Sequence, residues 1–65
     1  MWTECDEVAD RIVRRLSPEQ LAAFARSSDA TRAYIRSQMP DESEVVLSNI
    51  AESLHLFCKG RITRR

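Results

Sequence analysis

The sequence contains few of the residues that interrupt helices or build catalytic sites. Its 65 residues include one glycine, two prolines, two cysteines and one histidine. A single glycine cannot form a glycine-rich phosphate loop, and a single histidine gives little basis for a catalytic triad. Runs of strand-forming residues are also missing. We therefore expect an all-α protein that is not an enzyme and binds no cofactor.

Two cysteines are too few for the disulfide framework of a small secreted protein. Cys5 and Cys58 each fall on the apolar stripe of a predicted helix, where a cysteine acts as a small buried hydrophobic residue. The sequence has neither a basic segment followed by an apolar run at its start nor an apolar stretch long enough to span a bilayer. These features predict a cytoplasmic protein without membrane contact.

One group of potential metal ligands lies on a single predicted helix. Glu52, His55 and Cys58 follow one another at spacings of three residues. Metal proteins that use a Glu-x-x-His pair take a second set of ligands from another helix, and this chain offers only Cys5 for that role. We expect no metal site.

The longest predicted helix covers residues 42–59 and organises the rest of the chain. Asp41 and Glu44 have the spacing of a capping box at its start, and Gly60 is placed to end it in a left-handed turn. Its apolar seam repeats at spacings of three and four residues and consists of Leu47, Ile50, Leu54 and Phe57. A seam of this length requires other helices to cover it.

Two apolar residues of the same helix face away from this seam. Val45 and Leu56 occupy positions where an isolated helix would carry polar groups, so we expect a second molecule to cover them. Trp2 and Tyr34 are further candidates because aromatic side chains recur in binding hot spots, whereas Phe24 suits the core. The partner-binding residues that we predict are therefore Trp2, Tyr34, Val45 and Leu56.

A shorter helix is predicted over residues 4–16. Thr3 can cap it, with Asp6 at the third helical position completing a capping box. Its apolar face is formed by Cys5, Val8, Ala9, Ile12, Val13 and Leu16. If the first and last helices run parallel, the two cysteines lie at opposite ends of the bundle, beyond disulfide reach.

The next helix begins with the most specific local pattern in the chain. Ser17 is placed as its cap, Pro18 suits the first helical position, and Gln20 completes the capping box. The apolar stripe then changes phase near Ser28. Because Ser-Ser-Asp contains neither glycine nor proline, we favour one helix over residues 18–38, and a break at Ser27 and Ser28, with Ser28 as a new cap, is the alternative.

These elements predict a three-helix bundle, or a helical hairpin with a long third helix. The domain covers residues 1–60 and is followed by a basic tail, residues 61–65. A chain of this length buries only about 60% of its unfolded surface, so we expect self-association into a homodimer. Acidic and basic segments alternate along the chain, a pattern that suits packing between copies.

Function is predicted from the balance of charge and the lack of catalytic motifs. The net charge is zero, unlike the one-sided excess of a dedicated nucleic-acid binder. We expect stoichiometric binding to a protein partner. Scarce lysine and abundant arginine are typical of genes of GC-rich bacteria, phages or plasmids, which favours the cytoplasm of a bacterium or bacterial host. Size, composition and the lack of catalytic motifs resemble the small inhibitors or anti-activators that phages and mobile elements direct against host regulatory proteins.

A small helix-turn-helix DNA-binding regulator is the alternative function. A break at Ser27 and Ser28 would create two short helices, the second carrying arginines on adjacent turns. The residues that would contact nucleic acid are Arg32, Arg36, Arg61, Arg64 and Arg65. A turn without glycine and a net charge of zero argue against this alternative, because phosphate contacts dominate such affinity.

Overall fold

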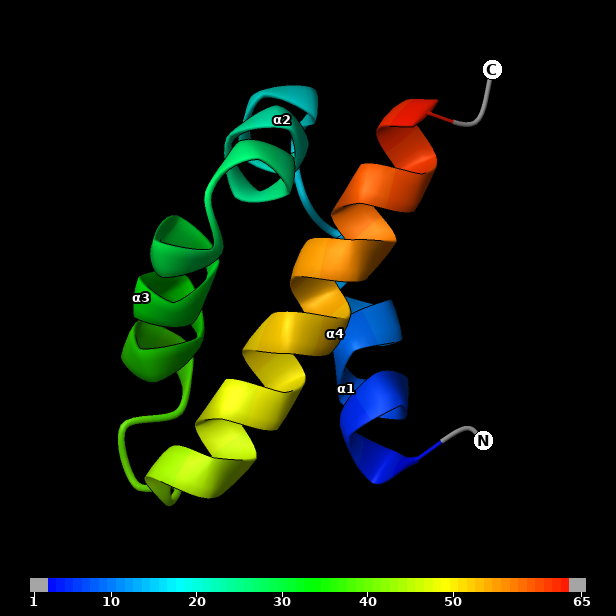
Figure 1. The fold of residues 1–65 in the computed structure, drawn as a ribbon. Helices are drawn as coiled ribbons and strands as arrows, with labels where there is room; N and C mark the ends of the chain where they lie inside the picture. Colours follow the sequence, from blue (N-terminus) through cyan, green and yellow to red (C-terminus); the bar gives the residue numbers. More distant parts are fainter. Residues whose placement is uncertain (1–2, 64–65) are drawn as a thin grey trace.

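The computed structural model describes residues 3–63, with only the backbone at Thr63, and this part of the chain consists of helices without a strand. The four helices are α1 (Glu4–Val13), α2 (Pro18–Arg26), α3 (Ser28–Gln38) and α4 (Glu44–Thr63). Figure 1 shows α4 running the length of the molecule, with α1 on one flank and α2 and α3 on the other. The all-α prediction is confirmed, but the described chain forms four helices instead of three.

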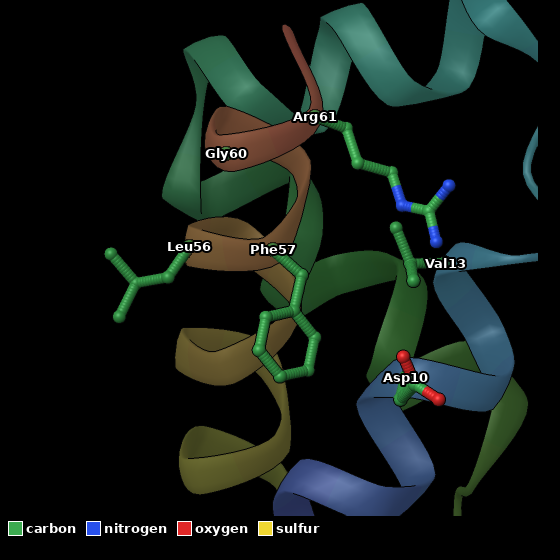
Figure 2. Close-up of a pocket in the computed structure, with 6 residues that line it drawn as sticks. All are labelled: Asp10, Val13, Leu56, Phe57, Gly60 and Arg61. Atoms are coloured by element: carbon green, nitrogen blue, oxygen red, sulfur yellow. The ribbon is translucent and has the colours of Figure 1, made fainter. Parts of the chain in front are cut away.

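Helices α1 and α4 run in the same direction, as expected for the first and last helices (Figure 1). Near the start of α1, Asp6 accepts a hydrogen bond from Ser53 of α4 at 2.7 Å. At the other end of α1, Val13 lies beside the C-terminal part of α4 (Figure 2). Cys5 is partly buried, Cys58 is fully buried, and both are free thiols.

The two capping boxes predicted for the first half of the chain are both present. Thr3 Oγ1 accepts a hydrogen bond from the Asp6 amide, and Asp6 Oδ2 accepts one from the Thr3 amide at 2.9 Å. Ser17 and Gln20 make the same reciprocal pair of bonds, each 3.1 Å long. Helix α1 ends at Val13 and not at residue 16, because the chain must become extended at Ser17 to cap α2.

The single helix expected over residues 18–38 is wrong. Ser27 has an extended backbone, with φ −138° and ψ 114°, and it ends α2 and begins α3. Its amide donates to the Ala23 carbonyl at 3.1 Å, and its hydroxyl accepts from the Ala30 amide at 3.1 Å. The alternative break is therefore confirmed, with Ser27 as the cap in place of Ser28.

Tertiary packing explains why the chain bends at this position. On one straight helix Phe24 and Ile35 would share a face about 16 Å apart. The bend at Ser27 instead lets α2 and α3 run in different directions while both residues stay in the same buried cluster (Figure 1). Thr31 fixes the bend because the one hydrogen of its buried hydroxyl is shared between the carbonyls of Phe24, at 3.0 Å, and of Ser27, at 2.9 Å. Side-chain hydrogen bonds thus replace the glycine or proline that a break normally requires.

Both predicted ends of the last helix are wrong. The helix begins at Glu44, and Ser43 caps it by accepting the Val46 amide on its hydroxyl at 3.3 Å, so Asp41 forms no capping box. At the other end α4 continues through Gly60 to Thr63. No residue in the range 3–63 has a positive φ, so the left-handed turn expected at Gly60 does not form.

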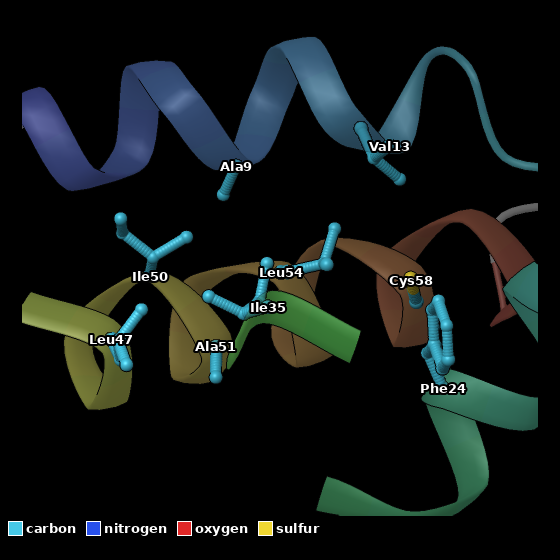
Figure 3. Packing of buried hydrophobic residues seen from close by; sticks show 9 residues of the cluster. All are labelled: Ala9, Val13, Phe24, Ile35, Leu47, Ile50, Ala51, Leu54 and Cys58. Carbon is cyan, nitrogen blue, oxygen red and sulfur yellow. The ribbon is translucent and has the colours of Figure 1, made fainter. Parts of the chain in front are cut away.

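The hydrophobic core gathers side chains from all four helices onto the inner side of α4 (Figure 3). Leu54 and Ile35 are fully buried at its centre, and Phe24 is 7% exposed, as predicted for a core residue. Phe57, which was expected in the seam, is only partly buried at the edge of this cluster. The buried hydrophobic residues are Ala9, Val13, Phe24, Ile35, Leu47, Ile50, Ala51, Leu54 and Cys58.

The bonds at Asp6 predict an acid-dependent contribution to stability. The Ser53 hydroxyl and then the Thr3 amide lower the pKa of Asp6 below its ordinary value of 3.8. The Asp6 carboxylate therefore binds a proton more readily in the unfolded chain than in the folded one. Its stabilising effect is complete above the ordinary pKa of 3.8 and is lost as pH falls through the lowered pKa of the folded state. Asp6→Asn should flatten the decline of the unfolding free energy below about pH 4, measured by urea denaturation.

Glu4→Gln provides the matched control, because Glu4 is an exposed acid in the same helical turn and takes part in neither bond. This variant should keep the acid-dependent decline of the wild type. An Asp6→Asn chain with the same pH profile as the wild type would contradict the role given to Asp6.

Candidate interaction surface

The outward side of α4 carries two strongly exposed aliphatic residues. Val45 is 71% exposed and Leu56 is 58% exposed. They lie eleven residues apart, about three helical turns, and therefore point to the same side of the helix. Exposed Asn49 and Glu52 lie between them on that side. We call these four residues, Val45, Asn49, Glu52 and Leu56, the α4 outer face.

A groove lies between the C-terminal parts of α1 and α4, with a volume of about 440 Å³ (Figure 2). We call it the α1–α4 groove, and its lining residues are Asp10, Val13, Leu56, Phe57, Gly60 and Arg61. Figure 2 shows Leu56 directed away from α1, whereas Arg61 extends from α4 toward α1. The groove thus has apolar walls with one acid and one base.

The charges in this groove belong to different helices. The Asp10 carboxylate accepts Arg14 Nε at 3.0 Å, within α1. Arg61 forms no ion pair with any residue of the described range 3–63. Burial raises the pKa of the neighbouring Cys58 thiol, and the positive charge of Arg61 opposes part of that rise. The fully buried thiol is therefore a core group and not a nucleophile.

A second groove, of about 410 Å³, lies on the other side of Leu56, between α3 and α4. We call it the α3–α4 groove. Arg32 and Glu52 contribute opposite charges to it, and His55 also lines it. His55 Nδ1 lies 2.6 Å from the Phe24 carbonyl, which can only accept, so Nδ1 is the donor. His55 therefore connects α4 to α2, and Leu56 forms a ridge between two grooves.

The four predicted partner-binding residues occupy different environments. Val45 and Leu56 are exposed on the α4 outer face. Tyr34 is partly buried, and its ring centroid lies 5.0 Å from that of Phe24, with 42° between the ring planes. Its ring is thus part of the packing at the edge of the core. Trp2 lies outside the described residues.

The predicted nucleic-acid contacts that the structure describes, Arg32, Arg36 and Arg61, line different depressions. Arg32 and Arg36 are exposed one turn apart on α3, but Asp29 lies in the same shallow depression. Arg36 also pairs with Glu44 of α4, Nη2 to Oε1, at 2.7 Å. Arg61 lies in the α1–α4 groove, next to α1. The remaining two, Arg64 and Arg65, lie outside the described residues.

The described part of the chain forms neither a cluster of metal ligands nor a membrane-spanning helix. In residues 3–63, no three side chains of His, Cys, Asp or Glu come together to hold a metal ion. Glu52 is exposed while Cys58 is fully buried, so their regular spacing in sequence does not create a site. Among the described helices, none combines the length and apolar character needed to cross a membrane.

Comparison with known proteins gave no match: no family model fits the chain, and no curated protein or solved structure is significantly similar to it. Function is therefore inferred from the exposed side chains and the two grooves. The sequence predicted the exposure of Val45 and Leu56, but it did not predict that Asp10 and Gly60 line one groove, because that depends on where α1 crosses α4. An isolated glycine inside a helical pattern was the available signal.

Proposed function

We propose that this chain is a non-enzymatic helical protein that acts by binding another protein in a stoichiometric complex through the α4 outer face. The observation that carries this proposal is the exposure of Val45 and Leu56, at 71% and 58%, on one side of the helix whose other side forms the core. Exposed apolar side chains that share one face and have a polar surround are a common feature of protein-binding sites.

The spacing of these residues suits recognition of a helix face. Anchors in such complexes recur one to several turns apart on one side of a helix, and Val45 and Leu56 are three turns apart. Glu52 lies between them, and both Glu52 and Arg32 line the α3–α4 groove. A partner bound there therefore meets charged groups around the apolar contacts. Such polar groups contribute specificity more than affinity.

Size and composition support a particular kind of partner. The size of 65 residues, the composition and the lack of catalytic motifs resemble the small inhibitors or anti-activators of phages and mobile elements. Such a protein acts by occupying a surface of its target. We therefore extend the proposal to a regulatory protein in the bacterial cytoplasm as the partner.

The proposal predicts that a charge on the α4 outer face prevents capture of the partner. Tagged wild type should recover a partner from a bacterial lysate in a fixed molar ratio. Val45→Asp and Leu56→Asp should each reduce recovery about tenfold or more, because an unpaired carboxylate at an apolar contact costs at least about 1.4 kcal/mol.

Ala23→Asp is the control variant, because Ala23 is an exposed apolar residue on α2, outside the α4 outer face. It should recover as much partner as the wild type, and circular dichroism should show the same helix content for all chains. Equal recovery of the same partner by wild type, Val45→Asp and Leu56→Asp would show that the proposed surface is wrong.

The helix-turn-helix regulator remains the second candidate function, and one observation favours it. The chain breaks at Ser27 between α2 and α3, as that alternative requires, and Arg32 on α3 is exposed. A connection of one residue is shorter than the usual three-to-four-residue turn. Acidic Asp29 and Glu44 also lie close to the arginines of α3 and weaken attraction to phosphate.

Binding to random duplex DNA distinguishes the two candidates. If the chain acts by binding a protein, we expect no band shift in a gel-shift assay at any salt concentration tested. Tight binding that weakens steeply with salt, and weakens further in Arg32→Ala, would favour the regulator instead. Arg15→Ala is a suitable control because Arg15 is an exposed arginine outside α3.

A further inference from the structure

We propose that a second copy of this chain docks in the α1–α4 groove. The two α4 helices cross antiparallel near Gly60, and Leu56 of each copy enters the groove of the other. This inference rests on the proposed function, because it names the occupant of the Leu56 end of the α4 outer face. The second copy and the other protein therefore compete for Leu56, whereas the Val45 end, roughly 16 Å away along the helix, contacts only the other protein.

Gly60 is the first observation behind this inference. It lies inside α4, without a positive φ, and a Cβ atom built on it would meet no atom of the described residues within 4 Å. A single copy therefore needs no glycine here, although glycine inside a helix is less favourable than alanine. What the missing side chain provides is room for a close approach from outside, and this room opens into the α1–α4 groove.

Leu56 is the second observation, because it stands beside the groove as an apolar projection. It is 58% exposed, and it is directed away from α1 at the rim (Figure 2). Val13 and Phe57 give the groove apolar walls, and its volume of about 440 Å³ is ample for a leucine side chain. A projection next to a matching recess allows two copies to fill each other's groove around a two-fold axis.

The charges of the groove make it complementary to itself. Asp10 lies on the α1 wall and Arg61 on the α4 wall, and no ion pair joins them within residues 3–63. A two-fold axis near Gly60 brings Arg61 of each copy toward Asp10 of the other. Asp10 already accepts Arg14, but a carboxylate has room for a second donor. A foreign partner would have to reproduce both charges, whereas a second copy supplies them by symmetry.

Sedimentation equilibrium of the purified full chain tests this inference over micromolar to millimolar concentrations. The wild type should change from monomer to dimer as concentration rises. Leu56→Asp should stay monomeric, and Gly60→Ala should raise the dimer dissociation constant about tenfold or more, because its methyl group fills the contact. Gly60→Ala should at the same time raise the melting temperature of the dilute monomer, a result that excludes misfolding as the cause.

Val45→Asp is the matched control for Leu56→Asp. Val45 is even more exposed, lies on the same helix, and does not line the groove. Its dimer dissociation constant should equal that of the wild type. Loss of the dimer in Val45→Asp together with an unchanged dimer in Gly60→Ala would overturn the proposed geometry.

An exchange of charges tests the two-fold arrangement itself. Arg61→Asp chains would face two acid pairs in a homodimer, and Asp10→Arg chains would face two basic pairs, so each should be monomeric alone. Mixed in equal amounts, they should form a heterodimer in which both contacts join opposite charges. Failure of the mixture to associate would contradict the pairing of Asp10 with Arg61.

The dimer and the binding of another protein are tested by different measurements, so that one can fail without the other. A wild type that stays monomeric over the whole concentration range overturns the dimer, whatever a lysate pull-down recovers. A dimer with the expected variants supports the inference even where no second protein is captured.

Discussion

The inner side of α4 holds the whole structure together, because α1, α2 and α3 each pack against it. Leu54 lies fully buried in the middle of this contact, and Leu47, Ile50 and Cys58 extend it in both directions. Burying one leucine completely stabilises a fold by roughly 1.5–3 kcal/mol, which is a large share of the stability of so small a domain. The three shorter helices therefore depend on one long helix.

The same constraint determines which surface is left for binding. Since the inner side of α4 is used by the core, Val45 and Leu56 on the other side stay exposed. The lines where α1 and α3 meet α4 form the two grooves beside Leu56. Gly60 adds a position where the surface is open next to the helix backbone. One helix thus provides both the scaffold and the proposed binding site.

Local signals predicted α1, the start of α2 and the exposed residues of the proposed binding surface. The capping box at Ser17 and the exposure of Leu56 follow from patterns within a few residues. The break at Ser27 could not be predicted in the same way, because it depends on tertiary contacts in which the Phe24 carbonyl accepts from Thr31 of α3 and from His55 of α4. The pairing of α1 with α4, which creates the α1–α4 groove, is likewise a property of tertiary packing and not of local sequence.

The most direct test of the account compares Leu54 on the buried inner side of α4 with Leu56 on its exposed outer face. Urea denaturation of the dilute chain should show that Leu54→Ala lowers the unfolding free energy by about 2–5 kcal/mol, because it leaves a cavity at the centre of the core. Leu56→Ala should change it by less than about 0.5 kcal/mol. Equal losses for the two variants would contradict the assignment of inner and outer faces.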